Sequence, residues 1–149
     1  MLIAQRTAEV TWDGSLASGN GRVTSGSGAL TNLPVTWAAR TEAPGGKTSP
    51  EELIAAAHAT CFTMALALVL GETGKPPQRL VTRARCVLEK DHGALRITQV
   101  AITVPTRTDS LGAKAFQAAV DGASTLCPVS NAIRGNVEVT VEAKLDDRA

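Results

Sequence analysis

Two cysteines in this sequence lie in surroundings that favour thiol chemistry. Cys61 lies in the middle of Leu53–Leu70, a stretch that contains no Asp, Glu, Lys or Arg. Cys127 directly precedes Pro128, where unpaired amide groups and the positive end of a helix dipole would favour a thiolate. Buried packing is the alternative for either thiol, because free cysteine behaves as a small hydrophobe. If both are reactive, they could form a redox pair.

The third cysteine and a histidine have weaker signals. Cys86 lies in the alternating segment ARCVLEK and is interpreted as sheet packing. His58 precedes Cys61 by one helical turn, so the two side chains share a helix face. A zinc site could use both residues with Cys127, but the paired close spacings of structural zinc sites are absent. We therefore predict no metal and expect His58 to be a satisfied buried histidine or a partner of the thiol.

A thiol on an apolar helix needs a fixed cation to become nucleophilic, because burial raises its pKa. Arginine suits this role, since it stays charged when partly buried and its planar fork could bridge a thiolate and a carboxylate. The candidates are Arg40, before a loop, and Arg22, in the turn GNGRV. Surface solvation is the alternative for either residue.

The composition limits the partners and the location of the protein. A chain of 149 residues fits a single domain, 1–149, and its 15 basic and 14 acidic residues, with few aromatics, argue against nucleic-acid binding. Arg6 and Glu9 interrupt the region where a signal peptide would be apolar, and three widely spaced cysteines suit a reducing compartment, so a cytoplasmic location is expected. A membrane span at residues 53–70 is rejected because the stretch contains His58 and several threonines and alanines and has no basic anchors.

Three strands are expected before the apolar stretch. Ala4–Trp12 and Gly19–Leu30 mix β-branched with polar residues around a turn at Asp13-Gly14-Ser15, which predicts a hairpin. A third strand is expected near Val35–Arg40. The segment Thr41–Ser49 collects Pro, Gly and small polar residues, which is typical of a flexible loop that could cover a site.

The apolar stretch predicts a helix from Pro50 to about Leu70. Ser49 can act as its N-cap, Glu52 completes a capping box, and Gly71 can end the helix. A helix that is apolar on most sides is expected to be buried on most sides. In a chain of this size, burial between two subunits would achieve that.

The second half of the chain predicts two strands, two helices and a last strand. This mixed order is typical of an α+β domain rather than of regular βαβ units. The two strands, Arg79–Lys90 and Leu95–Val104, are expected to form a hairpin. One helix is expected from Asp109 or Ser110 to about Ser124 and a second from Pro128 to Gly135, and the last strand is expected at Val137–Leu145.

The cysteine motifs resemble those of a known family. SPEELIAAAHATCFTMAL and CPVSNAI, with ARTEAPGGKTSPEEL before the first thiol, closely resemble the OsmC/Ohr family of cysteine-dependent hydroperoxide reductases over nearly the whole chain. The position of Arg40 just before the loop favours the OsmC branch, whereas the Ohr branch would point to Arg22. The resemblance implies an α+β OsmC-like fold, with antiparallel sheets around long central helices, in an intertwined homodimer.

The resemblance also implies a cysteine-based peroxidase that depends on a dithiol. Cys61 would be the peroxidatic thiol, Cys127 the resolving thiol, and Arg40 with Glu51 the pair that activates Cys61, with Glu52 as the rival acid. Peroxide would oxidise Cys61 to a sulfenic acid, a disulfide with Cys127 would follow, and a small dithiol or lipoyl-type reductant would reduce it without metal, haem or flavin. The expected substrates are organic hydroperoxides, and more weakly hydrogen peroxide, in oxidative or osmotic stress defence.

Apolar walls are expected to favour organic over hydrogen peroxide. The candidate wall residues, each of which could instead be simple core packing, are Phe62, Met64, Leu66 and Leu126. Two other functions stay open for the whole chain: a non-enzymatic redox sensor, and an apolar-ligand-binding dimer whose thiols are merely buried.

The spacing of Glu51 and Cys61 raises a question of geometry. Ten residues of continuous helix separate two side chains by about 15 Å along the axis and by roughly 80° around it, so both could not meet one arginine directly. We therefore hypothesise that Glu51 serves Cys61 of the partner subunit in a dimer. The alternative is a chain that folds back before the helix begins.

Overall fold

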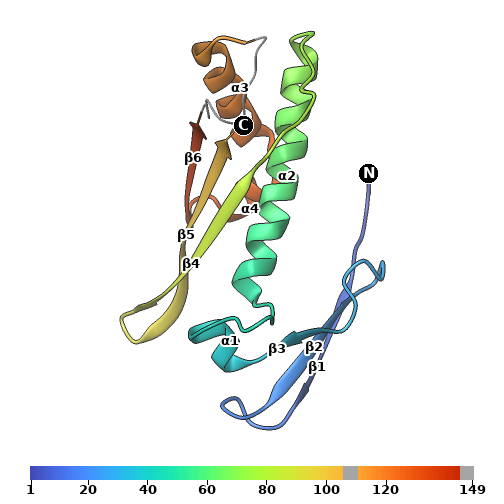
Figure 1. Cartoon of the computed structure of the whole chain (residues 1–149), viewed down its shortest axis with the longest axis vertical. Coiled ribbons are helices and arrows are strands. Elements are labelled where there is room, and N and C mark those ends of the chain that lie inside the picture. The colour runs from blue at the N-terminus through green and yellow to red at the C-terminus, as the bar shows by residue number, and fades with distance from the viewer. Residues whose placement is uncertain (106–110, 145–149) are drawn as a thin grey trace. The chain divides into compact units, whose positions relative to one another are not determined.

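The long apolar helix of the sequence is α2, which runs from Pro50 to Glu72 (Figure 1). The computed structural model describes residues 1–105 and 111–144. The helix begins where the capping signal predicted, because the amide of Glu52 donates a hydrogen bond of 3.2 Å to Ser49 Oγ. Helix α2 is long and apolar enough to cross a membrane. The core helix of a soluble protein can have the same length and composition, so this is weak evidence for a membrane span.

The chain forms two compact units, Met1–Leu53 and Ile54–Ala149, and α2 passes from the first into the second. The expected single domain therefore stays a prediction. The first unit holds an antiparallel three-stranded sheet in the order β1-β2-β3. The predicted hairpin is its first two strands, and the three strands span Ala8–Asp13, Asn20–Ser25 and Leu33–Val35.

The expected strand near Val35–Arg40 is wrong in most of its length, because the chain turns into a short helix, α1, at Trp37–Thr41. Thr36 causes the change: its backbone is extended and its side chain accepts the amide of Ala39 at 3.1 Å, as an N-cap does. Arg40 therefore lies in the last turn of α1 rather than at the end of a strand.

The second unit is built on the sheet β4-β5-β6, with strands at Arg83–Asp91, Ala94–Pro105 and Glu138–Lys144. The predicted hairpin joins β4 to β5 through His92 and Gly93, which both have positive φ, as a type I′ turn requires. The expectation of antiparallel sheets fails at one ladder, because β5 and β6 pair in parallel. The long connection through two helices allows this direction.

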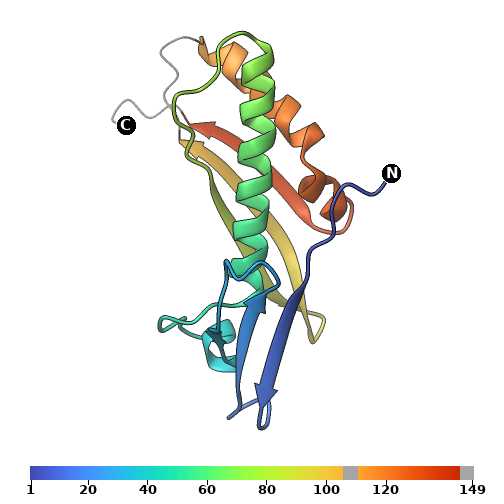
Figure 2. The ribbon, with the colours of Figure 1, turned by 90° about the vertical axis from the view of Figure 1, so that its right-hand side faces the viewer.

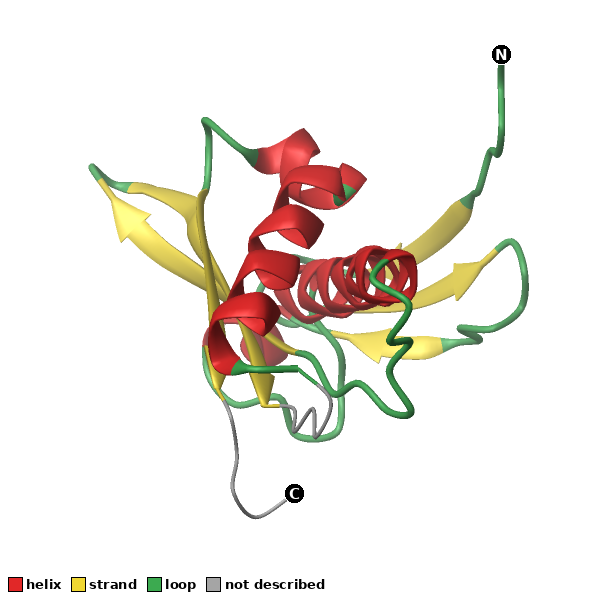
Figure 3. Cartoon of the chain, turned by 90° about the horizontal axis from the view of Figure 1, so that it is seen from above, coloured by secondary structure: helices red, strands yellow, loops and turns green. Residues whose placement is uncertain are grey.

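Two helices follow β5, namely α3 at Ala113–Leu126 and α4 at Pro128–Ile133. The expected opening of the first at Asp109 or Ser110 lies outside the described residues, and Gly112 is the N-cap of α3. Within this unit, α2 and α3 lie on the same face of the sheet (Figures 2 and 3).

The core of the second unit lies between that sheet and the helices. Its buried side chains come from α2, β5 and α3 and include Phe62, Leu66, Leu70, Ile102, Val104, Phe116 and Val120. This core requires the apolar alternation of β5 and the apolar stripe of α3 to face one another.

Truncation of this core should be costly. Phe116 is fully buried, so Phe116→Ala is expected to lower the free energy of unfolding by about 3–5 kcal/mol through lost burial and a cavity. Urea unfolding followed by circular dichroism measures the change. Lys114→Ala, at an exposed position of the same helix, is the matched control and should change stability by less than about 0.5 kcal/mol. Equal effects of the two substitutions would contradict this description of the core.

Candidate active site

Two of the three cysteines meet in the second unit. Cys61 lies on α2 and is half-buried, and Cys127 lies fully buried at the junction of α3 and α4. Their Sγ atoms are 3.1 Å apart, and both residues are reduced. The two sulfurs are thus in direct contact across sixty-six residues of sequence.

Cys127 is the N-cap of α4, as the Cys-Pro sequence predicted. Its sulfur accepts the amide of Ser130 at 3.4 Å. Burial raises the pKa of this thiol, but hydrogen bonds from the hydroxyl and amide of Ser130, then from Cys61 and the amide of Val129, outweigh burial and lower the pKa from its ordinary value. The protein therefore stabilises the thiolate form of Cys127.

The surroundings of Cys61 shift its pKa in the opposite direction, upward from its ordinary value. Burial raises its pKa, the contact with Cys127 raises it further, and the hydrogen bond from the amide of Val129 lowers it only in part. Within this unit, the contacts of Cys61 keep its proton on the sulfur. A nucleophilic Cys61 therefore needs an additional positive charge.

His58 and Ser130 form a buried polar pair behind the sulfurs. The ring Nε2 of His58 lies 2.7 Å from Ser130 Oγ, and both residues are fully buried. Burial lowers the pKa of His58, so the ring is neutral at neutral pH. The expectation that His58 is buried is confirmed, but the expectation that it is fully satisfied is wrong, because Nδ1 has no hydrogen-bond partner among the described residues. The partner of Nε2 is the serine rather than Cys61. Ser130 was missed by the sequence reasoning, although its position three residues after the cap Cys127 was a usable signal.

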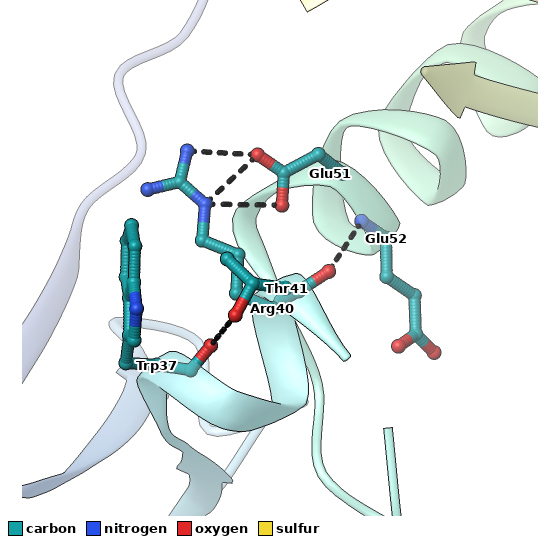
Figure 4. A network of polar contacts seen from close by, with 6 residues as sticks. Trp37, Arg40, Thr41, Glu51 and Glu52 are labelled. Atoms are coloured by element: carbon teal, nitrogen blue, oxygen red, sulfur yellow. Dashed lines mark hydrogen bonds and ion pairs between the residues drawn. The ribbon is translucent and has the colours of Figure 1, made fainter. Parts of the chain in front are cut away.

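Arg40 and Glu51 form an ion pair in the first unit (Figure 4). The Nη2 and Nε atoms of Arg40 donate to Glu51 Oε1 at 2.8 and 3.0 Å, and Nε also contacts Oε2 at 3.3 Å. The guanidinium also lies 5.9 Å from the centre of the Trp37 ring, which is within cation–π range. The carboxylate is 10% exposed and the arginine 30%, so the pair is only partly screened by solvent.

The rival residues take other roles. Glu52 is exposed, and its amide is bonded to the N-cap Ser49. Arg22 lies on β2 and donates to the carbonyl of Asn32 at 3.4 Å. The structure thus pairs Arg40 with Glu51, the combination that the resemblance implied, while their role in activating Cys61 stays a prediction.

The remaining candidates are spread over the fold. Cys86 is half-buried on β4, where it pairs with Val100 of β5. Phe62 and Leu66 are fully buried in the core, so they serve packing, whereas Met64 and Leu126 are exposed. Across residues 1–105 and 111–144, no three His, Cys, Asp or Glu side chains gather in a way that could hold a metal ion.

An apolar cavity of about 440 Å³ lies beside Arg40 within the first unit. Its walls include Trp12 and Leu16 from the hairpin, Trp37 from α1 and Leu53 from the start of α2. None of these residues was among the predicted wall residues. The cavity could hold an apolar group next to a guanidinium.

The chain combines an α+β scaffold with a thiol on a long helix, and this thiol contacts the sulfur that caps a second helix. These features define a protein of the OsmC-like class with a pair of facing thiols. The family model described as OsmC-like protein matches residues 43–142. The chain is 34% identical to peroxiredoxin OsmC of Escherichia coli over 93% of its own length and 96% of that protein. It is also 34% identical to the organic hydroperoxide resistance protein OhrB of Bacillus subtilis, over 93% and 97% of the two chains.

Solved structures agree with this relationship. The crystal structure of an organic hydroperoxide resistance protein OsmC from Legionella pneumophila is similar at a TM-score of 0.76 with 27% identity, over 96% of this chain and all of that chain. The OhrB structure from Bacillus subtilis gives 0.72 with 32% identity, over 93% and 98% of the chains. The chain belongs to the OsmC/Ohr family, as the cysteine motifs indicated.

Proposed function

We propose that this protein is a thiol peroxidase that reduces organic hydroperoxides to alcohols. The observation that carries the proposal is the 3.1 Å contact between Cys61 Sγ and Cys127 Sγ, which brings two thiols together for disulfide chemistry. The relatives named peroxiredoxin OsmC and organic hydroperoxide resistance protein OhrB support the same activity. Cys61 is the better candidate for the attacking thiol because it is the more exposed of the pair.

In the first step the Cys61 thiolate attacks the terminal oxygen of the hydroperoxide. The S–O bond forms, the O–O bond breaks, and the alkoxide leaves with the bonding electrons and takes up a proton to give the alcohol. Cys61 becomes a sulfenic acid. Cys127 then condenses with it, and an external dithiol, of the small or lipoyl type that the resemblance implies, reduces the disulfide by exchange.

Arg40 supplies the positive charge that the thiolate of Cys61 requires. The contacts within the second unit raise the pKa of Cys61, so a cation is needed to reverse that effect. Glu51 holds the guanidinium through two donors, which fixes its plane and its position. The cavity beside Arg40 gives the alkyl part of the substrate an apolar place, which favours organic over hydrogen peroxide.

In this proposal the protein acts as a homodimer, and Arg40 and Glu51 of one subunit stabilise the thiolate of Cys61 in the other subunit. Helix α2 is continuous from Pro50 to Glu72, so the spacing of about 15 Å along its axis between Glu51 and Cys61 applies. Only 28% of its most apolar window is buried within the chain. Met64 and Leu68, one turn apart on α2, are 69% and 56% exposed, which leaves an apolar stripe for a second copy to cover.

A mass measurement after one equivalent of cumene hydroperoxide tests the proposal. The reduced protein is expected to lose two hydrogens in one turnover, and peptide mapping is expected to join Cys61 to Cys127. Cys86→Ser should give the same result, because Cys86 has no step in the mechanism. A bridge that includes Cys86, or a protein that stays reduced, would reject the assignment of the two thiols.

A further inference from the structure

We propose that His58 and Ser130 form a hydrogen-bond relay that stabilises the sulfur of the resolving Cys127 as it attacks the Cys61 sulfenic acid, and thereby sets the rate of disulfide formation. The relay deepens the function proposed above and rests on it. His58 and Ser130 are positioning residues, since they act through Cys127 and not on the peroxide.

The direction of the relay follows from the nitrogen that has no partner. Within the described part of the chain, His58 Nδ1 is buried and makes no hydrogen bond. A buried N–H without an acceptor is rarer and more costly than an acceptor without a donor, so the ring proton belongs on Nε2. The Nε2–H group then donates to Ser130 Oγ across the 2.7 Å contact.

The serine hydroxyl, which accepts a hydrogen bond from His58, in turn donates one to the sulfur of Cys127. A hydroxyl has one proton to donate, and with its oxygen accepting from Nε2 it directs that proton to Cys127 Sγ. The amide of Ser130 donates to the same sulfur at 3.4 Å. One buried residue therefore supplies two donors to Cys127, and His58 polarises the first of them.

The relay matters at the second chemical step. The Cys127 thiolate attacks the sulfur of the Cys61 sulfenic acid, the S–S bond forms, and the S–O bond breaks. Hydroxide leaves with the bonding electrons and takes a proton from solvent to give water, so Cys127 is oxidised as the sulfenic sulfur is reduced. His58 keeps its proton throughout, because burial holds the ring neutral.

Step-resolved kinetics test the relay. In Ser130→Ala, formation of the Cys61 sulfenic acid should not slow, because a weaker Cys127 thiolate raises the pKa of Cys61 less. Conversion of the sulfenic acid to the disulfide should slow about tenfold, the effect of losing one hydrogen bond to a charged sulfur. Trapping with dimedone should then capture more sulfenic acid. Ala132→Ser, a small change at an exposed position of α4, is the control and should leave both steps unchanged.

Two histidine variants separate the relay from simple packing. His58→Gln places an amide N–H near the position of Nε2 and should keep most of the disulfide rate, whereas His58→Asn places it near Nδ1 and should lose about tenfold. Equal rates for the two variants, or an equal slowing of both chemical steps in Ser130→Ala, would overturn the relay.

The relay can also be tested without peroxide. In protein that carries Cys61→Ser and Cys86→Ser, ultraviolet thiolate absorbance at neutral pH reports Cys127 alone, and Ser130→Ala should lower it. An unchanged absorbance would overturn the relay even if the wild-type protein reduces hydroperoxides. A lowered absorbance in a protein that leaves hydroperoxides intact would instead reject the proposed function and keep the hydrogen-bond chain.

Discussion

Cys61→Ser is expected to reduce hydroperoxide consumption at least about 1000-fold, to the background of the reductant alone. Serine lacks a nucleophile of comparable reactivity, and removal of a catalytic nucleophile commonly costs several orders of magnitude. The rate is measured with cumene hydroperoxide and a dithiol under multiple turnover. Such turnover by the wild-type protein also separates an enzyme from a redox sensor that oxidises only once.

Cys86→Ser is the matched control for this substitution. Cys86 is also a half-buried, reduced cysteine, but it lies on β4 in the sheet. The peroxidase activity of the Cys86→Ser variant should remain within about twofold of the wild type, because the change is conservative and lies outside the reacting groups. Full activity of Cys61→Ser would support the alternative of a dimer whose thiols are merely buried.

Arg40→Lys is expected to slow oxidation of Cys61 about 100-fold. Lysine keeps the charge but loses the planar fork that holds Glu51 through two nitrogen atoms, so the cation is no longer fixed. Stopped-flow oxidation by limiting cumene hydroperoxide measures the step. Arg22→Lys, which alters an exposed arginine bonded to the carbonyl of Asn32, is the control and should change the rate by less than about twofold.

Mixed dimers then test the shared site. Coexpression of Arg40→Lys with Cys61→Ser subunits should give heterodimers in which one site has an intact Cys61 and a partner with Arg40. If half of the dimers are mixed and each has one working site, activity should return to about a quarter of the wild type, since the contributions of separate sites add. A mixture as inactive as its two parents would reject the arrangement across subunits.

The sequence predicted those parts of the fold that depend on local chemistry. Ser49 as the cap of α2, the turn at His92 and Gly93, and Cys127 as the cap of α4 each rest on residues close in sequence, and the structure confirms them. Thr36 shows how such a signal is missed, because a β-branched residue among apolar neighbours favoured a strand while its hydroxyl caps α1.

Contacts between segments far apart in the sequence could not be predicted from local sequence signals. The parallel ladder of β5 and β6 and the bond between His58 and Ser130, seventy-two residues apart, depend on how the second unit packs. The family resemblance supplied the pairs Cys61–Cys127 and Arg40–Glu51, which spacing alone left open. The cytoplasmic location and the choice of the OsmC branch stay predictions from the sequence.

The close approach of the two sulfurs should protect the protein from its own substrate. A sulfenic acid that waits for its partner can react with a second peroxide and pass irreversibly to the sulfinic state. Here the gap of 3.1 Å needs to close by only about 1 Å to reach a disulfide bond length. We therefore expect capture of the intermediate to outpace hyperoxidation, so that the protein remains repairable during a sudden excess of oxidant.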